Sequence, residues 1–243
     1  MNNNNEIYIV TGSSSGLGKS FVSQLNNEGK NSIGIDKDKA PTTNLNIDLG
    51  NLSEDDCKKI KDLVGNNKIK SIVHCAAVQK SSERDFENLS SSFNEIFSVN
   101  TKSIYLLTMT LKELFTETSS VCIISSVHAQ ATTEENILYA SSKSALSGLV
   151  KGLTATFKNN FSAFEIILGA MDSPMLFNSI YKNELAKLEN KLPSGKVLST
   201  SDVANLLIDL INNYSKILHG SSIRLDNGIL SILASEWYTL ISR

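Results

Sequence analysis

The chain has 243 residues, of which 41% are hydrophobic and 20% are charged, and its formal net charge is -2. This length can bury one large core, so we expect a single domain over residues 1–243. The near-neutral charge argues against nucleic-acid and membrane partners. The three cysteines are widely spaced and predict neither a disulfide framework nor a metal site. The sequence shows no signal peptide or membrane span, and we expect a cytoplasmic protein.

The N-terminal part contains a glycine-rich turn between a strand and a helix. Residues 6–10 are apolar and β-branched, which predicts a buried strand, and helical spacing of apolar residues follows from about 16 to 28. Between them, Thr11-Gly-Ser-Ser-Ser-Gly-Leu-Gly18 predicts a phosphate cradle, because the free N–H groups at a helix start attract an anion. The cofactor-binding residues expected here are Gly12, Ser14, Ser15, Gly16, Leu17 and Gly18.

A second strand is expected at 32–36, and it ends in Asp36. An acid at this distance from the glycines is placed to accept hydrogen bonds from the adenosine ribose and to repel a 2′-phosphate. Lys37 follows directly, and a base at this position can tolerate that phosphate. The sequence therefore favours NAD(H) as the cofactor, with NADP(H) as the open alternative.

Strand and helix patterns alternate along the whole chain. Alternation predicts a single-domain α/β fold that is Rossmann-like, with a doubly wound parallel sheet and helices on both faces. The predicted strands are 6–10, 32–36, 70–75, 120–125, 164–168 and 222–226. The predicted helices are about 16–28, 54–64, 91–116, 136–158 and 201–213. Ligands of such sheets bind beyond the carboxyl ends of the strands, where the chemically distinctive residues fall.

Tyr139 and Lys143 lie one helical turn apart on the same face of the predicted helix 136–158. A phenol has a reference pKa of about 10, and a cation beside it favours the phenolate. We therefore expect Lys143 to lower the pKa of Tyr139, so that the phenol can exchange a proton with a substrate oxygen. Ser126 ends a predicted strand upstream and can hydrogen-bond the same oxygen.

In their order and spacing, these residues resemble the short-chain dehydrogenase/reductase family in its compact form, over residues 6–228. The resemblance implies that Tyr139 is the general acid in reduction and the general base in oxidation, with Ser126 holding the substrate oxygen. It implies that Lys143 also binds the nicotinamide ribose. It further implies that Asn100 is a catalytic relay residue, which holds a water near Lys143.

The resemblance also implies further contacts with the cofactor. Besides the glycine-rich turn, these are Asp36, Asp48, Leu49, Cys75, Ala76, Tyr139, Lys143, Met171 and Ser173. The chain departs from the family pattern at three places, since it has His74-Cys75-Ala76-Ala77 for Asn-Asn-Ala-Gly, Leu168-Gly169 for Pro-Gly, and Ser173 for threonine. None of these changes removes a catalytic group, and the backbone of Cys75 and the hydroxyl of Ser173 remain available to the cofactor.

The expected activity is that of an NAD(P)-dependent oxidoreductase, which transfers a hydride between the nicotinamide and a secondary alcohol or its carbonyl. A non-catalytic sensor of NAD(P) redox state is an alternative, although such proteins typically lose the tyrosine or the lysine. A sugar-nucleotide epimerase or dehydratase is another, although these enzymes generally carry a larger C-terminal substrate domain.

The substrate side of the site is expected to come from several segments. The residues predicted to contact substrate are Ser126, His128, Tyr139 and Met175. Residues 173–198 are expected to form a substrate lid, or else to pack on the body, because apolar residues recur there at helical spacing. They are Met175, Leu176, Phe177, Ile180 and Tyr181.

The two ends of the chain and its assembly complete the predictions. Residues 1–5 are expected to form a disordered leader. Residues 229–243, which include Trp237, form a C-terminal tail that could cover a neighbouring subunit or pack on its own chain. The family resemblance implies a homodimer or a homotetramer built through the long predicted helices at 91–116 and 136–158.

Overall fold

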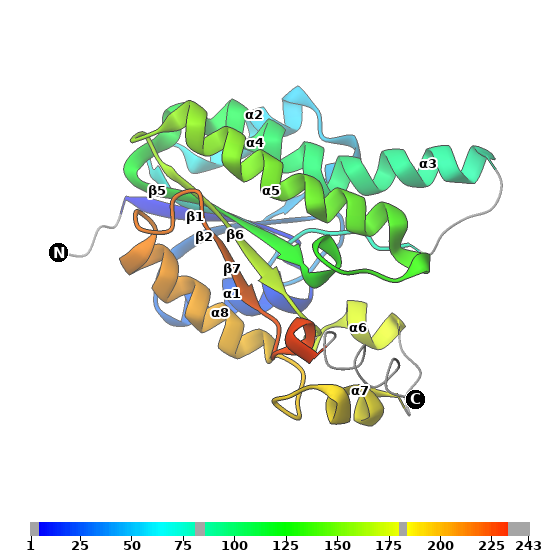
Figure 1. Cartoon of the computed structure of the whole chain (residues 1–243). Coiled ribbons are helices and arrows are strands. Elements are labelled where there is room, and N and C mark those ends of the chain that lie inside the picture. The colour runs from blue at the N-terminus through cyan, green and yellow to red at the C-terminus, as the bar shows by residue number, and fades with distance from the viewer. Residues whose placement is uncertain (1–4, 81–85, 180–183, 233–243) are drawn as a thin grey trace, which may run out of the picture.

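The computed structural model describes residues 5–80, 86–179 and 184–232. A seven-stranded sheet with the order β3-β2-β1-β4-β5-β6-β7 runs through the centre, and helices cover both of its faces (Figure 1). Every neighbouring pair of strands is parallel. The strand order reverses between β1 and β4, which is where such sheets bind their ligands. The predicted doubly wound, Rossmann-like α/β fold is confirmed.

The strands agree with the sequence prediction in number and place, with one addition. They are β1 (Glu6–Thr11), β2 (Asn31–Asp36), β3 (Leu45–Asn46), β4 (Lys68–His74), β5 (Phe115–Ser126), β6 (Ser162–Leu168) and β7 (Ser222–Leu225). The short strand β3 was not predicted, because two residues are too few for an apolar pattern and their pairing with β2 alone defines them. β5 begins at Phe115, inside the segment predicted as helix 91–116.

The helices fall into two layers and a separate group. They are α1 (Gly16–Asn27), α2 (Glu54–Val64), α3 (Phe86–Phe97), α4 (Ser103–Leu111), α5 (Ile137–Phe157), α6 (Pro174–Ser179), α7 (Leu185–Lys191) and α8 (Thr200–Asp209). Helices α2 to α5 cover one face of the sheet and α1 and α8 cover the other, while α6 and α7 lie beyond the carboxyl ends of the strands (Figure 1). Helices α6 and α7 fall within the predicted lid at 173–198.

The helix predicted at 91–116 is interrupted in the structure. α3 begins at Phe86, and a π-helical segment (Ser98–Lys102) separates it from α4. Inside this segment, the side chain of Asn100 accepts a hydrogen bond from the backbone N–H of Val78 at 2.7 Å and donates to the carbonyl of Val78 at 3.0 Å. The wider turn places this amide against the loop after β4, a tertiary contact that the apolar pattern does not encode.

The helix predicted at 201–213 ends earlier in the structure, because a second π-helical segment follows it. α8 ends at Asp209, and the segment Leu210–Tyr214 continues from it with a wider turn. Single wide turns of this kind interrupt the helical spacing by one residue, so a sequence pattern of period 3.6 merges both parts into one helix.

The core has two apolar layers, one on each face of the sheet. Alternate residues of β1 point to opposite faces, so that Ile9 packs among α2, α4 and α5 and Val10 packs among α1 and α8. Phe21 of α1 and Leu146 of α5 are fully buried in these layers. Burial of each such large side chain stabilises the fold by about 1.5–3 kcal/mol.

The predictions for the chain ends are only partly addressed by the described residues. Asn5 accepts a hydrogen bond from the N–H of Lys68 at 2.8 Å, so the prediction of a disordered leader is wrong for this residue. Residues 1–4 and 233–243, with Trp237, lie outside the described residues, as do Ile180 and Tyr181 of the predicted lid. Within the described ranges, every helix is too short or too polar to cross a membrane.

Candidate active site

A cavity of about 760 Å³ lies at the carboxyl ends of the strands, where the strand order reverses. Of the site residues predicted from the sequence, only Asn100 is absent from its walls. The predicted residues that line it are Gly12, Ser14, Ser15, Gly16, Leu17, Gly18, Asp36, Asp48, Leu49, Cys75, Ala76, Ser126, His128, Tyr139, Lys143, Met171, Ser173 and Met175. The fold therefore brings residues that are up to 163 positions apart, from Gly12 to Met175, to one cavity.

The glycine-rich turn is shaped by close backbone approaches. Gly12 has a φ of 71°, and a Cβ there would lie 2.7 Å from the backbone nitrogen of Ala76. A Cβ on Gly18 would lie 2.2 Å from the carbonyl oxygen of Gly12, so α1 can pack on the turn only with glycine at this position. Gly16 differs, because the atom nearest to an added Cβ is the Cβ of Ser173, at 3.5 Å. Its backbone is therefore open to a ligand in the cavity.

The start of α1 fits the phosphates of a dinucleotide. The side chain of Ser15, the N-cap residue, makes no capping hydrogen bond, and the first turn contains no acidic residue. The N–H groups of this turn therefore face the cavity without a capping side chain, and the positive end of the helix dipole favours an anion there. Together with the open backbone at Gly16, this arrangement fits a pyrophosphate.

Asp36 stands at the edge of the cavity and is held by backbone donors. Its Oδ2 accepts the N–H of Ser14 at 2.9 Å, and its Oδ1 accepts the N–H of Asp38 at 3.0 Å. A carboxylate has about four acceptor positions, so two remain for ribose hydroxyls. Lys37 also lines the cavity and is exposed. The acidic side chain of Asp36 and the basic side chain of Lys37 thus meet at the same edge of the cavity.

Asp48 and Leu49, which were expected to contact the cofactor, follow β3. The Asp48 carboxylate caps a short 3₁₀ turn by accepting the N–H of Gly50 at 2.9 Å and the side-chain N–H of Asn51 at 2.7 Å. Leu49 is buried beneath it. The carboxylate is therefore fixed in orientation while it remains on the cavity wall.

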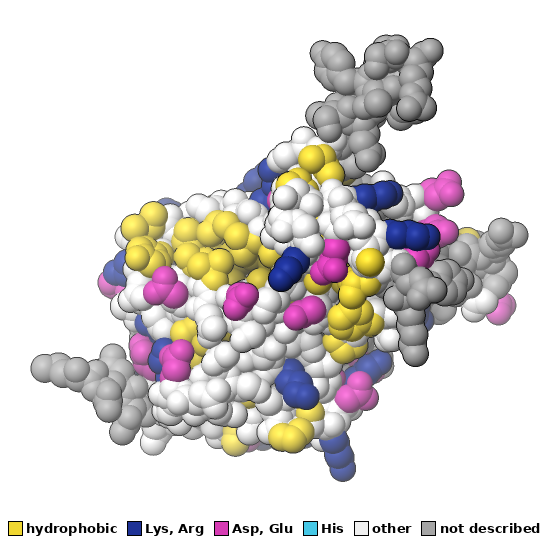
Figure 2. Space-filling model, turned by 90° about the horizontal axis from the view of Figure 1, so that it is seen from below, with side chains coloured by type: hydrophobic (Ala, Val, Ile, Leu, Met, Phe, Trp, Pro, Cys, Tyr) yellow, Lys and Arg dark blue, Asp and Glu magenta, His cyan; other side chains and the backbone are white. Residues whose placement is uncertain are grey.

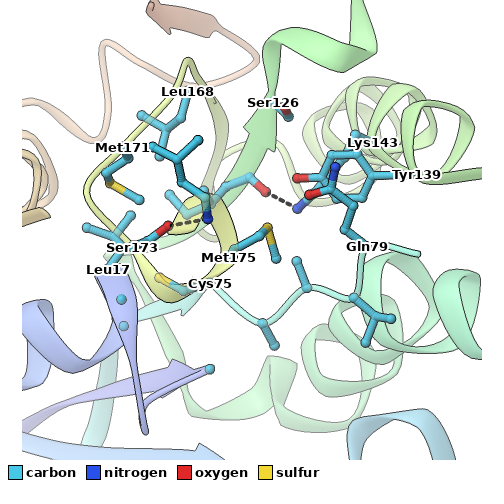
Figure 3. A pocket seen from close by; sticks show the side chains of 18 of the residues that line it. Leu17, Cys75, Gln79, Ser126, Tyr139, Lys143, Leu168, Met171, Ser173 and Met175 are labelled. Atoms are coloured by element: carbon cyan, nitrogen blue, oxygen red, sulfur yellow. Dashed lines mark hydrogen bonds between the residues drawn. The ribbon is translucent and has the colours of Figure 1, made fainter. Parts of the chain in front are cut away.

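Ser126, Tyr139 and Lys143 lie together at one end of the cavity (Figure 3). Ser126 is the last residue of β5, and the other two belong to the first turns of α5. All three are buried, with exposed fractions of 8%, 6% and 2%. The Ser126 hydroxyl accepts the N–H of His128 at 3.2 Å, and it lines the same end of the cavity as the Tyr139 side chain. Two hydroxyl groups can therefore reach one substrate oxygen.

The pKa of Tyr139 moves in the direction opposite to the prediction. Burial raises the pKa of Tyr139 to about 12, and the polar side chain of Ser126 opposes this rise only in part. The Lys143 ammonium lies 5.7 Å from the centre of the tyrosine ring and donates to the carbonyl of Ile124 at 2.8 Å. The loss of solvent around the phenol is the largest cause of the shift, and it decides the direction in which the pKa of Tyr139 moves.

Burial also lowers the pKa of Lys143 to about 8, and the charge of Glu165 opposes this change. Glu165 is fully buried in β6, where its Oε2 accepts the hydroxyls of Ser147 at 2.7 Å and Ser222 at 2.8 Å. The sequence analysis missed this acid. The available signal was a carboxylate inside the otherwise apolar strand at 163–168.

Asn100 lies behind the cavity and not in its wall. The N–H groups of its amide donate to the carbonyl of Val78 at 3.0 Å and to the hydroxyl of Ser142 at 2.9 Å. Its backbone carbonyl accepts from His74 Nε2 at 3.3 Å. Both amide N–H groups are therefore occupied, and a relay water near Lys143 would have to donate to an oxygen of Asn100.

His128 sits edge-on against Tyr139, with ring centres 5.7 Å apart. Its Nδ1 pairs with the hydroxyl of Thr132 at 2.9 Å, and burial lowers the pKa of His128. The ring is therefore neutral at pH 7 and polar toward the cavity that it lines.

The segment after β6 reaches the cavity from the opposite side. Met171 pairs with Leu198 in an isolated bridge, and the hydroxyl of Ser173 accepts the N–H of Leu176 at 3.4 Å at the start of α6. Gly169 is required before them, because a Cβ there would lie 2.8 Å from the Cα of Asp226.

Where the structure describes the predicted lid at 173–198, it contains the short helices α6 and α7. α6 supplies Met175 to the cavity wall, and α7 and the residue after it supply Leu188 and Leu192. Ile229 and Leu230, the first residues of the predicted tail, line the same wall. No local pattern predicts the place of Ile229 and Leu230 in the wall, because it depends on the turn that follows β7.

The sheet is Rossmann-like, and the glycine-rich turn lies at its switch point. Beside this turn lie a hydroxyl, a phenol and an ammonium group. This combination is typical of nicotinamide-dependent oxidoreductases. The family model described as enoyl-(acyl carrier protein) reductase matches residues 12–230. The chain therefore belongs to the short-chain dehydrogenase/reductase family of NAD(P)-dependent oxidoreductases.

Individual relatives agree with this assignment. An uncharacterized oxidoreductase of Staphylococcus haemolyticus is 29% identical over 190 residues, which cover 71% of this chain and 80% of that protein. The structure of a short-chain dehydrogenase family protein from Francisella tularensis superposes with a TM-score of 0.79 at 22% identity, over 93% of this chain and 98% of that one. 4-Hydroxyisoleucine dehydrogenase complexed with NADH gives a TM-score of 0.80 at 18% identity, over 93% and 99%.

Replacing the buried ammonium by Lys143→Met should change how stability depends on pH. Folding lowers the pKa of Lys143 from 10.5 to about 8, so between these values the unfolded chain binds more protons and the wild type gains stability as pH rises. We expect the unfolding free energy of the wild type, relative to the variant, to rise by about 3 kcal/mol from pH 8 to 10.5.

Urea denaturation followed by far-UV circular dichroism measures this difference at each pH. Lys151→Met, on the exposed side of the same helix, is the matched control for the loss of a lysine. Parallel curves for the wild type and Lys143→Met across this range would show that Lys143 does not titrate near pH 8.

Proposed function

We propose that this protein transfers a hydride between NAD(H) and a secondary alcohol or its carbonyl, with NADP(H) as the alternative cofactor. The observation that carries this proposal is that Ser126, Tyr139 and Lys143 lie together at one end of a cavity that also contains the glycine-rich turn. The described residues contain no group of three or more His, Cys, Asp or Glu side chains that could hold a metal ion.

The phenol of Tyr139 is the proposed proton donor. Burial keeps it protonated at neutral pH, since it raises the pKa of Tyr139 to about 12. During reduction, negative charge grows on the substrate oxygen, and the phenol gives its proton to that oxygen. The hydroxyl of Ser126 donates a second hydrogen bond, which stabilises the same charge. The protonated phenol supports the reductive direction.

Lys143 would hold the nicotinamide ribose from α5 and stabilise the phenolate left after proton transfer. Its ammonium is buried and already donates to the carbonyl of Ile124, so its two remaining N–H groups can reach ribose hydroxyls without rearrangement of the helix. The bound nicotinamide supplies or accepts the hydride.

The substrate would bind between Tyr139 and the two lid helices. This part of the wall is largely apolar, with Met175, Leu188 and Leu192 opposite the phenol and the neutral ring of His128 beside it. Such a wall favours an uncharged substrate whose carbonyl or hydroxyl carries an apolar substituent.

We also propose that the protein assembles through the outer face of α5. A Cβ added at Gly148 or Gly152 would meet nothing within 4 Å, so this face is open to a second helix. Ile137 at the start of α5, and Phe93 on α3, which packs against α5, are exposed apolar side chains. A flat face of this kind lets the same helix of a second copy pack closely.

A second apolar surface supports a tetramer. Figure 2 shows apolar side chains gathered on the side of the molecule where α8 lies. Leu206 of α8, with Tyr214 and Ile217 in the segment after it, are exposed there. Apolar side chains grouped in this way are typical of protein interfaces.

Removal of the phenolic hydroxyl by Tyr139→Phe should lower kcat by about 10²- to 10⁴-fold, the usual contribution of a positioned acid or base. The cofactor Kd should change little, because the ring is retained. The measurement is oxidation of NADH and NADPH, followed by absorbance, with a panel of aldehydes and ketones. Tyr105→Phe on α4 is the control, since that ring is exposed.

Two outcomes would contradict the catalytic proposal. Near-normal turnover by Tyr139→Phe would remove the phenol from the reaction. Cofactor binding by the wild type without turnover across the whole panel would instead favour a redox sensor.

Substitution of Asp36 should change the cofactor preference. Asp36→Ala removes the charge that repels a 2′-phosphate, so we expect the ratio of the NADP(H) to NAD(H) affinities to rise about tenfold or more. Asp36→Asn should shift the ratio in the same direction while keeping an acceptor for the N–H of Ser14. Titration of both cofactors measures the ratio, and an unchanged ratio in Asp36→Asn would exclude charge as its cause.

A large charged side chain on the open face of α5 should break the assembly. Gly148→Arg is expected to convert the oligomer into monomers, measured as molar mass by light scattering after size-exclusion chromatography. Asn66→Arg, on the exposed turn after α2, adds the same charge elsewhere and should leave the mass unchanged. A monomeric wild type, or an oligomer that persists in Gly148→Arg, would refute this interface.

A further inference from the structure

A chain of hydrogen bonds runs behind the cavity from the glycine-rich turn to α5. The hydroxyl of Thr11 pairs with His74 Nδ1 at 2.8 Å, and His74 Nε2 pairs with the carbonyl of Asn100 at 3.3 Å. The Asn100 amide donates to the hydroxyl of Ser142 at 2.9 Å, and that hydroxyl donates to the carbonyl of Tyr139 at 2.8 Å. The end of β1 is thereby connected to the catalytic tyrosine through His74.

The direction of each bond follows from the groups involved. A carbonyl can only accept, so the bond to Asn100 requires the hydrogen of His74 to be on Nε2. Nδ1 is then an acceptor, and the hydroxyl of Thr11 donates to it. The oxygen of Thr11 in turn accepts the N–H of Ala76 at 3.2 Å. One tautomer of one neutral ring therefore satisfies all of these groups.

The chain is shielded from water along its length. Thr11, His74, Asn100 and Ser142 are all fully buried. Burial, with the charge of Lys143, lowers the pKa of His74 to about 3, so the ring stays neutral at physiological pH. Because water cannot replace a lost bond in such a place, each member fixes the position of the next.

We propose that His74 is a positioning residue, which sets the spacing between the glycine-rich turn at Thr11 and the helix that carries Tyr139 and Lys143. Among the described residues, no hydrogen bond joins the turn directly to α5, and the ring of His74 has one nitrogen on the side of each. The inference rests on the proposed function, because His74 would position the cofactor-binding turn through Thr11 and the proton donor Tyr139 through Asn100.

Two substitutions separate the sides of the ring. In His74→Asn, the amide oxygen is bonded to Cγ, which is also where Nδ1 of histidine is bonded. It can therefore accept the hydrogen bond of the Thr11 hydroxyl, but the shorter side chain does not reach the carbonyl of Asn100. His74→Gln extends to the place of Nε2, so it can donate to the carbonyl of Asn100 but loses Thr11. Each variant therefore keeps one link of the chain and breaks the other.

The two variants should lose different properties. For His74→Asn, we expect kcat to fall about tenfold to a hundredfold, since a small displacement of Tyr139 is costly, while the cofactor Kd stays within about threefold of the wild type. For His74→Gln, we expect the Kd to rise about tenfold and kcat at saturation to stay within about threefold. A loss of the same property by both variants, in similar proportion, would overturn the proposal.

A readout without turnover distinguishes this inference from the proposed function. Hydrogen exchange of the backbone amides at 139–143 should be about tenfold faster in His74→Asn and unchanged in His74→Gln, because only the former loses the bond that holds Asn100, the partner of Ser142, in place. This split supports the positioning role even if the panel of substrates shows no reaction. Equal exchange in both variants would refute the role whatever the activity.

Two further variants guard against a simple folding defect. Ser142→Ala breaks the chain at its far end and should reproduce the kcat loss of His74→Asn with an unchanged Kd. Ser120→Ala removes a comparable buried hydroxyl pair with Ser71, outside the chain, and should change neither property more than about twofold. If kcat falls as much in Ser120→Ala as in Ser142→Ala, the losses come from a general loss of stability, and the positioning role of His74 is refuted.

Discussion

The close approach of two strand ends is the constraint on which the rest of the structure depends. β1 and β4 are neighbours in the sheet, and their chains turn away toward opposite sides of it. A Cβ at Gly12 would lie 2.7 Å from the backbone of Ala76, so only glycine allows this approach. The divergence of the chains creates the cavity, and the contact places the phosphate cradle beside the end of β4. His74 and Thr11 meet directly beneath this contact.

Burial sets the electrostatics of the site more strongly than the pairing of charges does. It raises the pKa of Tyr139 to about 12 and lowers that of Lys143 to about 8, so both groups move toward their neutral forms. A tyrosine kept protonated is ready to donate, and a lysine kept near its titration point can gain charge when a partner arrives. The expectation that the lysine alone would acidify the phenol neglected this shared loss of solvent.

The departures from the predicted elements have a common origin in side chains that bond across the fold. Asn100 widens its helix because its amide reaches the loop after β4, and a pattern of apolar residues carries no record of that partner. Glu165 can be buried in a strand of apolar residues because the hydroxyls of two serines from other elements donate hydrogen bonds to its carboxylate. His74 looked like a mere departure from a family pattern, yet its ring joins three segments.

The sequence by itself determined the order of most strands and helices and the glycine-rich turn, which follow from local periodicity. The resemblance to a family added most of the other cavity residues that were predicted. Only the tertiary structure decided the pKa directions, the two-part lid, the part of Ile229 in the wall and the hydrogen-bond chain through His74. The physical reason is that solvent exclusion and long-range hydrogen bonds depend on which segments meet, and that choice is made by the packing of the whole chain.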